Sequence, residues 1–382
     1  MIPAHVIVYT VAGKTGPGTT RWGRLRRMSE PTTPSKPATI REVAARAGVS
    51  TATVSRSLRG GVGVEPATRA KVEAAARELR YRPSGVARSL KMGATKTLGL
   101  IVTDIENPYF PQIVRAVEDA ALEQGYTVLL ADGRRDPERE LESLDILGEH
   151  EVDGMIIAST TLTRRHGERI RELPCPVIIM NSDSTVPDVP AVMSDNYSGG
   201  RLAAEHILGL GHRTIAFVGG PEGEISVQAR VDGVRAAVTE HMAVDGDRFR
   251  VVDADASFDG GVRAAETLVA GGIRETALLC RNDLTAIGVL RGLKAAGVRV
   301  PHDVSVVGFD DIEMSAYVDP ALTTLHQSTD EMARRAVADL FQRVSRGREE
   351  VGVAVVHPPG ETYLVPVELV VRASSGPPPV SY

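Results

Sequence analysis

From residue 97 onward, short apolar runs alternate with amphipathic segments along almost the whole chain. The apolar runs have the length and the Val, Ile and Leu content of buried strands: 98–104, 127–132, 154–159, 176–182, 214–220, 277–283 and 304–311. Segments with helical spacing separate them, at 109–124, 137–149, 198–210, 226–240, 258–270 and 284–296. Repeated β-α-β order produces parallel sheets covered by helices on both faces. Nearly 290 residues of this pattern predict an α/β fold with two doubly wound subdomains.

Residues 39–60 have a different pattern, that of two short helices joined by a tight turn. Thr39 and Glu42 form a T-x-x-E capping box, which starts the first helix. Gly48 permits the positive φ that lets a second helix, 51–58, pack at a steep angle, and Ser50 can cap that helix. Proline at position 66 then begins a third helix, 66–80, whose apolar face completes a small core. This layout predicts a helix-turn-helix unit.

Charge is strongly segregated along the chain. Residues 39–96 contain 12 Lys and Arg against 4 Asp and Glu, although the whole chain has a net charge of −5. A basic head on an acidic body suits binding to DNA phosphates. We therefore expect the second helix to enter the major groove, with these residues facing the DNA: Thr51, Ala52, Thr53, Ser55 and Arg56. The alternative is an ordinary helical hairpin on which Arg56 is a solvated surface charge.

Polar side chains follow several of the predicted strands: Asp104, Asn107, Asn181, Asn282, Asp283, Asp310 and Asp311. In parallel α/β sheets, ligands bind beyond the carboxyl ends of the strands. Amides and carboxylates that converge there can bond the hydroxyls of a sugar, although each residue alone could equally be a turn former or a helix cap.

The head and the segment after it resemble the LacI/GalR family of transcription regulators, through AGVSTATVSRSL (47–58) and YRPSGVARSLKMGATKTLGLIV (81–102). The resemblance implies a hinge helix that pairs with its counterpart in a dimer and enters the minor groove. Leu90 matches the residue that wedges into the central base step, with Ala87 beside it, and Arg88 is expected to contact phosphate.

The body is similar to the effector-binding core of the same family, which is related to periplasmic sugar-binding proteins. The most specific segments are NPYF (107–110), QARVDG (228–233) and the long run from Cys280 to Asp311. The resemblance implies that Arg230, Asn282 and Asp310 hold the hydroxyls of a sugar effector, with further pocket residues at Asn107, Tyr109, Phe110 and Asn181. Asn181 stands where the family often has Asp.

These observations divide the chain into five parts. We expect a tail without regular structure (1–38, with Met28 as a candidate natural start), a DNA-binding head (39–82), a hinge (83–96), an effector-binding core (97–372) and a C-terminal tail (373–382). Within the core, about 97–193 and 324–355 form the first subdomain, and about 194–323 and 356–372 form the second.

Other classes of protein are disfavoured by the sequence. No nucleophile-elbow, P-loop, dinucleotide or zinc-protease motif is present, so we expect neither an enzyme nor a cofactor or metal site. Cys175 and Cys280 are expected to be buried and reduced, and no apolar run is long enough to span a bilayer. The prediction is a cytoplasmic, homodimeric, sugar-responsive repressor that binds a near-palindromic operator. The alternatives are a secreted sugar-binding protein without a DNA role, or a regulator that responds to a non-sugar ligand such as a nucleobase.

Overall fold

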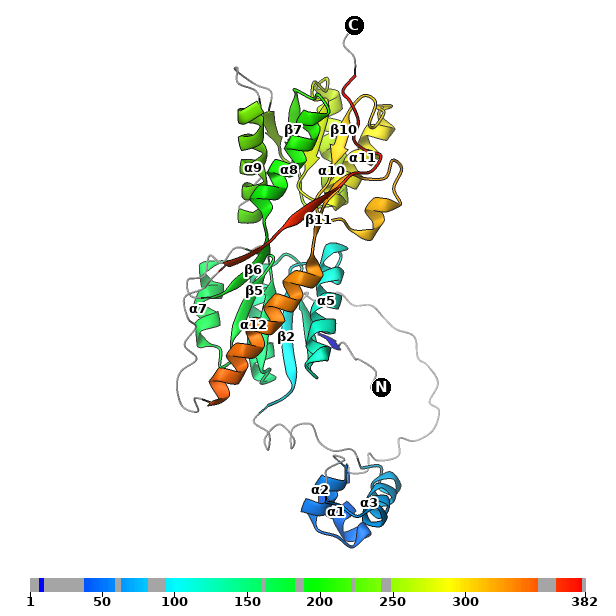
Figure 1. The fold of residues 1–382 in the computed structure, drawn as a ribbon, viewed down its shortest axis with the longest axis vertical. Coiled ribbons are helices and arrows are strands. Elements are labelled where there is room, and N and C mark those ends of the chain that lie inside the picture. The colour runs from blue at the N-terminus through cyan, green and yellow to red at the C-terminus, as the bar shows by residue number, and fades with distance from the viewer. Residues whose placement is uncertain are drawn as a thin grey trace, which may run out of the picture. The chain divides into compact units, whose positions relative to one another are not determined.

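The computed structural model describes residues 7–9, 38–58, 63–81, 94–159, 162–182, 189–220, 224–241, 249–349 and 362–379. Residue contacts divide the chain into two compact units, residues 12–95 and residues 1–11 together with 96–382 (Figure 1). The hinge residues Ala87, Arg88 and Leu90 lie outside the described residues. None of the described helices is both long and apolar enough to cross a membrane.

Among its described residues, the smaller unit has the helices α1 (Ile40–Ala47), α2 (Thr51–Leu58) and α3 (Pro66–Glu78). The predicted capping box is present, because the backbone N of Thr39 donates to Oε2 of Glu42 at 2.6 Å and the Thr39 hydroxyl accepts from the Glu42 amide. Gly48 has φ +67°, the left-handed conformation that the turn requires. A small apolar core joins the three helices: Val43, Ala44, Val54, Val72, Ala75 and Ala76.

The larger unit contains a seven-stranded parallel sheet in the order β1-β3-β2-β4-β5-β6-β12. Its strands are β1 (Ile7–Tyr9), β2 (Thr97–Val102), β3 (Thr127–Asp132), β4 (Gly154–Ala158), β5 (Val177–Met180), β6 (Ala191–Ser194) and β12 (Thr362–Val365). The helices that pack on this sheet are α5 (Tyr109–Glu123), α6 (Pro137–Glu149), α7 (Arg164–Glu172) and α12 (Thr329–Glu349).

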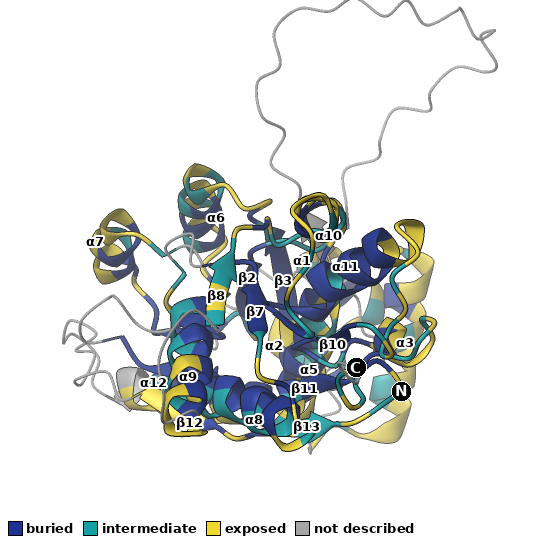
Figure 2. Cartoon of the chain, turned by 90° about the horizontal axis from the view of Figure 1, so that it is seen from above, coloured by how far each residue is buried: buried dark blue, intermediate teal, exposed yellow. Residues whose placement is uncertain are grey.

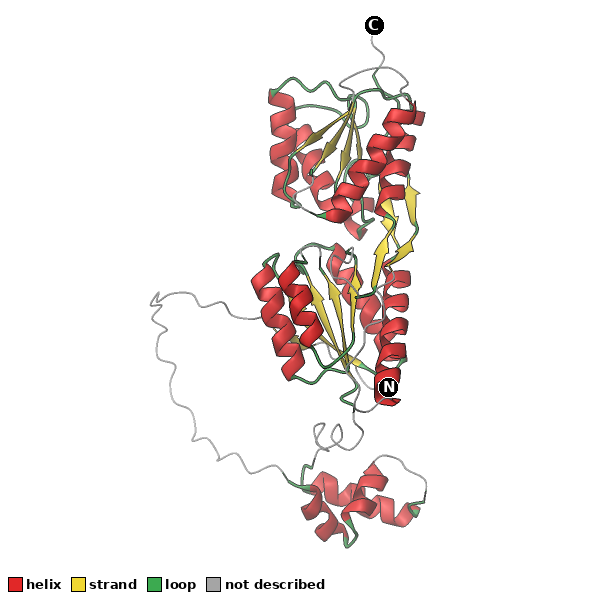
Figure 3. Ribbon diagram, turned by 90° about the vertical axis from the view of Figure 1, so that its left-hand side faces the viewer, coloured by secondary structure: helices red, strands yellow, loops and turns green. Residues whose placement is uncertain are grey.

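Both faces of this sheet are buried, as the continuous apolar runs predict. Leu100 and Val102 pack with α5 and α12, whereas Ile101, between them, packs with α6 and α7. Successive side chains of a strand point to opposite faces, so a strand that is apolar at every position must be covered twice. Figure 2 shows β2 and β3 in the colour of buried residues, with exposed surfaces on the outer helices, and Figure 3 shows helices on both sides of the sheet.

A second parallel sheet has four strands in the order β10-β9-β7-β8. The strands are β7 (Ile215–Val218), β8 (Phe249–Val252), β9 (Ala277–Cys280) and β10 (Ser305–Val307), followed by a short 3₁₀ helix η1 (Glu313–Ala316). Helices α8 (Asn196–Gly209) and α9 (Ile225–His241) cover one face, and α10 (Phe258–Ala270) and α11 (Asp283–Ala295) cover the other. The core is therefore α/β with two doubly wound sheets, as predicted. Cys175 and Cys280 are both buried and free.

The connections between the two subdomains differ from those expected at 324 and 356. Strands β11 (Thr324–Gln327) and β13 (Val367–Val370) form a separate antiparallel pair. Strand β12, which we assigned to the second subdomain with residues 356–372, pairs with β6 of the first sheet. The chain thus returns to the first sheet before it crosses again, a path that apolar content alone does not reveal. Among the described residues, the crossings follow β6, β11 and β12.

Both predicted tails contain ordered residues. The expectation of no regular structure in residues 1–38 is wrong at Ile7–Tyr9, which form β1 and extend the first sheet beside β3. This run is apolar and includes a β-branched pair, which suits an edge strand. In the expected C-terminal tail, Ser374 is fully buried, accepts a bond from the Thr323 amide and donates to the carbonyl of Val306. These bonds bind the start of that segment to the second subdomain.

Candidate functional site

Helix α2 presents a polar face to solvent. Thr51, Ala52 and Arg56 are exposed, and Thr53 and Ser55 are half-buried, whereas Val54 is fully buried in the small core. The Ser50 hydroxyl accepts from the Thr53 amide at 3.1 Å and so caps the helix as expected. The five residues predicted to face DNA therefore all retain some exposure on one short helix.

Helix α1 is fixed to α3 by an ion pair on the outside of the core. Nε and Nη2 of Arg46 lie 3.0 and 2.7 Å from the two carboxylate oxygens of Glu78. The paired geometry holds the planar guanidinium in one orientation. This contact and the apolar core keep the relative positions of the three helices, on which the presentation of α2 depends.

A cavity of about 380 Å³ lies in the larger unit. Its wall includes residues of both subdomains: Thr103, Asn107, Tyr109, Phe110, Arg135, Asn181, Glu224, Ser226, Val227, Arg230, Asp255, Ala256, Arg281, Asn282, Asp310 and Gln327. The seven residues assigned above to the effector site are all among them, whereas Asp104, Asp283 and Asp311, which also follow predicted strands, are not. The volume falls in the range of small-molecule sites, about 300–1,000 Å³.

On the side of the first subdomain, Tyr109 organises the wall. Its hydroxyl donates to Oδ1 of Asn181 at 2.8 Å, and its backbone amide donates to Oδ1 of Asn107 at 3.1 Å. Tyr109 is 3% exposed, and burial raises the pKa of its phenol. Asn181 has φ +62°, a conformation that Asn tolerates better than most residues. This part of the wall is held by neutral hydrogen bonds.

On the side of the second subdomain, Arg230 extends from α9 into a buried position. Its Nε donates to Oδ1 of Asn196 at 2.8 Å, Nη1 donates to the carbonyl of Arg281, and the guanidinium lies over the Phe309 ring. Burial lowers the pKa of this guanidinium. Although Glu224 and Asp232 are close in sequence, Arg230 forms no ion pair with either of them in the described structure.

Asn282 and Asp310 complete this wall at the ends of β9 and β10. Oδ1 of Asn282 caps α11 by accepting from the Thr285 amide at 2.9 Å, so the amide nitrogen is the group left to donate to a ligand. Asp310 accepts a bond from Nε2 of Gln327 at 2.6 Å, and burial raises the pKa of its carboxyl. Oε1 of Gln327 is buried and has no partner among the described residues. The cavity therefore offers both donors and acceptors.

Several residues of the wall were not singled out from the sequence. Arg281 lies directly before Asn282 and forms an ion pair with Glu224, with Nη2 and Oε2 2.6 Å apart. Arg135 joins Asp104 to the carbonyl of Ala256, across two distant segments of the chain. Asp283, which also follows β9, points elsewhere and accepts from Ser315 and the Ile312 amide. A run of polar residues at a strand end does not reveal which of them turn inward.

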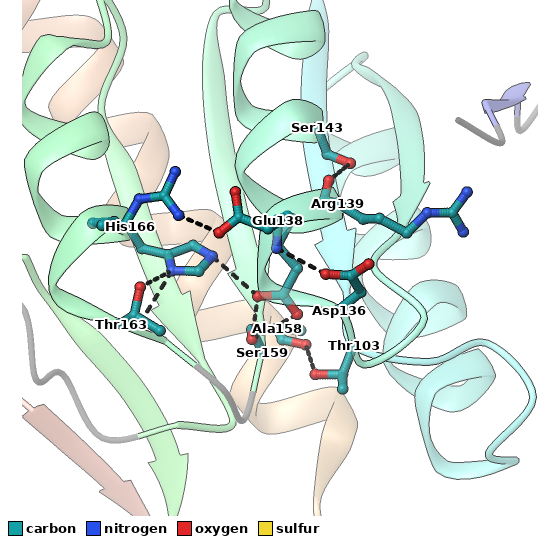
Figure 4. Close-up of polar contacts among 11 residues, drawn as sticks. Thr103, Asp136, Glu138, Arg139, Ser143, Ala158, Ser159, Thr163 and His166 are labelled. Atoms are coloured by element: carbon teal, nitrogen blue, oxygen red, sulfur yellow. Dashed lines mark hydrogen bonds and ion pairs between the residues drawn. The ribbon is translucent and has the colours of Figure 1, made fainter. Parts of the chain in front are cut away.

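A second buried polar cluster lies between β4, α6 and α7 and does not contribute to the wall of this cavity (Figure 4). Glu140 and His166 are both fully buried, with Oε2 of Glu140 3.4 Å from Nε2 of His166. The Ser159 hydroxyl donates to Glu140, and Thr163 bonds Nδ1 of His166. The cluster connects the loop after β4 to two helices.

Comparison with known proteins gives two family matches that together span most of the chain. Residues 39–84 match the family described as bacterial regulatory proteins, lacI family. Residues 95–359 match the family described as periplasmic binding proteins and sugar binding domain of LacI family.

Individual relatives cover both units. The ribose operon repressor of Escherichia coli K12 is 35% identical over 310 residues, which is 81% of this chain and 94% of the relative. The HTH-type transcriptional repressor PurR of Vibrio atlanticus is 34% identical over 322 residues, 84% of this chain and 96% of the relative.

Solved structures are similar as well. The lac repressor dimer bound to operator and an anti-inducer has a TM-score of 0.77 at 30% identity and covers 89% of this chain and 100% of that one. A LacI family regulator from Enterococcus faecium with bound ribose has a TM-score of 0.65 at 30% identity, with 74% and 99% coverage. On the strength of these matches, the chain belongs to the LacI family of bacterial regulatory proteins.

Proposed function

We propose that this chain is a dimeric transcriptional repressor that binds operator DNA through its three-helix unit and a small effector in the cavity of its larger unit. The observation that carries the proposal is the combination of a folded helix-turn-helix unit and a cavity lined by polar groups of two subdomains. An enzymatic role is not part of the proposal, and the site of action is the cytoplasm, where the DNA is.

For DNA, we assign direct contact with bases to α2. Arg56 is exposed and can bond guanine through two nitrogens, Ala52 can contact a thymine methyl group, and Thr51 offers a hydroxyl. Thr53 and Ser55 lie on the same helix and are assigned to its DNA-facing surface. By family resemblance, Leu90 would wedge into the minor groove, with Ala87 and Arg88 beside it; these three lie outside the described residues.

For the effector, we assign a small polyhydroxylated ligand, a sugar or a sugar derivative. The amide nitrogen of Asn282, the guanidinium of Arg230 and the carboxyl of Asp310 can hold adjacent hydroxyls from one side. Asn107, Tyr109, Phe110 and Asn181 would contact the ligand from the other side. A ligand that bridges the two walls stabilises one relative position of the subdomains, and it changes operator affinity if the two states differ in that position.

Dimer formation is supported by a groove outside the cavity. The groove is lined by Pro108, Pro111, Met314 and Tyr317 among other residues. Met314 is 50% exposed and Tyr317 is 79% exposed, which is unusual for large apolar side chains so close together. A second copy of the chain would cover them. Two heads in one dimer would match the two halves of a near-palindromic operator.

The test is a fluorescence-anisotropy titration of the full chain on labelled DNA from upstream of its own gene, with scrambled DNA of equal length as the control. Each titration is repeated with ribose, other neutral sugars, sugar derivatives and nucleobases. We expect tight, salt-sensitive binding to the specific fragment, altered by a sugar-type compound. A response to nucleobases alone would favour the other effector class. If the upstream and scrambled DNAs bind equally well, a selection from genomic DNA is the next test. Equal affinity for the selected fragment and for scrambled DNA would contradict the regulator proposal.

A further inference from the structure

One guanidinium in the cavity wall has fewer acceptors than its burial requires. Arg281 follows β9, lines the cavity and is 2% exposed. Its Nη2 pairs with Glu224, whereas its Nη1 is buried and has no hydrogen-bond partner among the described residues. A buried donor without an acceptor costs free energy, and the cost is greater for a charged group. A residue that lines a cavity and carries such a donor is a candidate contact for a ligand.

A second buried guanidinium lies next to the first. Arg230 donates to the side-chain oxygen of Asn196 and to the backbone carbonyl of Arg281, both of which are neutral. Burial lowers the pKa of Arg230, and the nearby positive charge of Arg281 lowers it further. Neither hydrogen bond therefore provides this positive charge with a negative partner.

The other carboxyls of the wall do not supply the missing charge directly. Asp255 pairs with the exposed Arg263 on α10. Asp310 accepts from Gln327, and burial raises the pKa of its carboxyl, which favours the neutral form; Arg230 acts against that shift. Glu224 is thus the one carboxylate in ion-pair contact with either buried guanidinium, within the part of the chain that the structure describes. Two guanidiniums share one direct counter-charge.

The backbone opposite Arg281 leaves room for its long side chain. A Cβ atom on Gly219 would lie 2.4 Å from Cδ of Arg281 and 2.6 Å from its Cγ. Gly219 also has φ +101°, which disfavours any side chain at this position. A side chain at position 219 would therefore displace Arg281, and the glycine directly after β7 leaves the space that the arginine occupies.

We infer that Arg281 binds an acidic group on the effector, so that the ligand is a polyhydroxylated molecule that carries a phosphate or a carboxylate. The planar guanidinium suits both groups, since two of its N–H bonds can match two oxygens of the anion. A hydroxyl would satisfy Nη1 but would leave the two guanidiniums with the single carboxylate of Glu224 as their direct counter-charge. This inference rests on the proposed function, because it names the ligand class of the same cavity.

The test compares neutral and acidic forms of one sugar skeleton by isothermal titration calorimetry on the full chain. The pairs are ribose with ribose 5-phosphate, and glucose with glucose 6-phosphate and glucuronate; inorganic phosphate is the bare-anion probe. We expect at least one acidic compound to bind about 10- to 100-fold more tightly than its neutral counterpart, the range for one charge-assisted hydrogen bond. The phosphate and carboxylate arms distinguish the two sources of the anion.

Two substitutions at Arg281 test whether this residue causes the preference for acidic compounds. Arg281→Gln keeps a neutral donor and should reduce the preference for the acidic form to about one, while Arg281→Lys should keep part of it. Arg291→Gln, which removes an exposed arginine from α11, is the matched control and should change nothing. Circular dichroism and thermal melts establish that each variant is folded. An acidic preference that survives in Arg281→Gln contradicts the inference.

The substitution Glu224→Gln should change the affinity for acidic compounds in the direction opposite to Arg281→Gln. Without the competing carboxylate of Glu224, the positive charge of Arg281 attracts a ligand anion more strongly, so the affinity for acidic compounds should rise relative to that for their neutral counterparts. Weaker binding of the acidic compounds would contradict the inference. Tight binding of neutral sugars without acidic preference would overturn the inference but leave the proposed function intact. If none of the tested compounds binds while the chain still binds its operator, both the inference and the proposal of a sugar-type effector are overturned.

Discussion

The guanidinium carbon of Arg230 lies 3.6 Å from the centre of the Phe309 ring, while its Nε donates to Asn196 at the start of α8. Stacking and hydrogen bonding fix the side chain without a carboxylate partner. Arg230 therefore projects as a fixed donor at the wall of the cavity, positioned by two helices and by the residue that precedes Asp310.

Replacing Arg230 with Ala should abolish the effect of the effector on operator binding while operator affinity without effector stays near that of the parent chain. The reason is that Arg230 contributes to the cavity wall and not to the DNA-binding unit. Anisotropy titrations with and without effector measure both quantities. Arg235→Ala on the same helix removes a guanidinium that is 55% exposed, and it is the matched control. A normal response in Arg230→Ala would remove Arg230 from the effector site.

Replacing Arg56 with Ala should weaken specific operator binding by about 1–3 kcal/mol, the value of a good contact with a base pair. Discrimination against one base position should relax at the same time. Arg77→Ala on α3 removes an arginine that is 75% exposed and tests the effect of charge alone. Equal losses in the two variants, on specific and random DNA alike, would show that Arg56 contributes only general electrostatic attraction.

The fold was largely predictable because the core strands are apolar at every position. A strand with this composition is fully buried only in a sheet that is covered on both faces. The strands β2, β4 and β9 overlap the predicted apolar runs. The pairing of β12 with β6 was not predictable, since a four-residue strand next to Pro366 carries no signal about which sheet it joins. Long-range pairing depends on the path of the chain and not on local composition.

The site was predictable to a similar extent. Polar residues at strand ends and family resemblance together indicated ten residues, and the structure places seven of them around one cavity. The other three, Asp104, Asp283 and Asp311, accept bonds from Arg135, Ser315 and Arg372 instead. The sequence did not indicate Arg281, because it lies within a run, Arg281 to Asp283, whose members diverge: the first two line the cavity and the third bonds Ser315. Where regular alternation stops, the direction of a side chain depends on the turn geometry.

Stability should depend on pH through His326. A hydrogen bond to Asp311, with Oδ2 3.1 Å from Nδ1, raises the pKa of this imidazole above its usual value, and Asp311, Glu368 and Asp330 all favour its charged form. The charged histidine therefore stabilises the fold fully at pH below about 6.5, and this contribution is lost as pH rises through the raised pKa.

Thermal melts of the parent chain and of His326→Gln should differ most at pH 6 and converge toward pH 8.5. His302→Gln removes an exposed histidine and should show no such convergence. The side chain of His326 is 44% exposed, so the difference will be small and should shrink in high salt. A gap that widens with rising pH would mean that the neutral imidazole is the stabilising form.

Removing Glu140 should destabilise the first subdomain more than removing its neighbour Glu138, although both lie in the first turn of α6 (Figure 4). Glu140 is fully buried between Ser159 and His166, and its loss removes two contacts of the Ser159 hydroxyl and the contact with the His166 ring. Removing one partner of a buried hydrogen bond in this way costs about 1–3 kcal/mol. Glu138 pairs with Arg165, and both side chains are 63% exposed, so its loss should cost about 1 kcal/mol or less.

Urea unfolding followed by far-UV circular dichroism measures the two losses, with Glu140→Ala and Glu138→Ala compared directly. Glu140→Gln retains an acceptor for Ser159, so its loss should fall between the other two. Because the cluster lies outside the cavity wall, effector affinity at low denaturant should be the same in all three variants. Equal destabilisation by Glu138→Ala and Glu140→Ala would show that the buried contacts of Glu140 contribute no more than a surface pair, and that the packing around α6 holds the loop after β4 by itself.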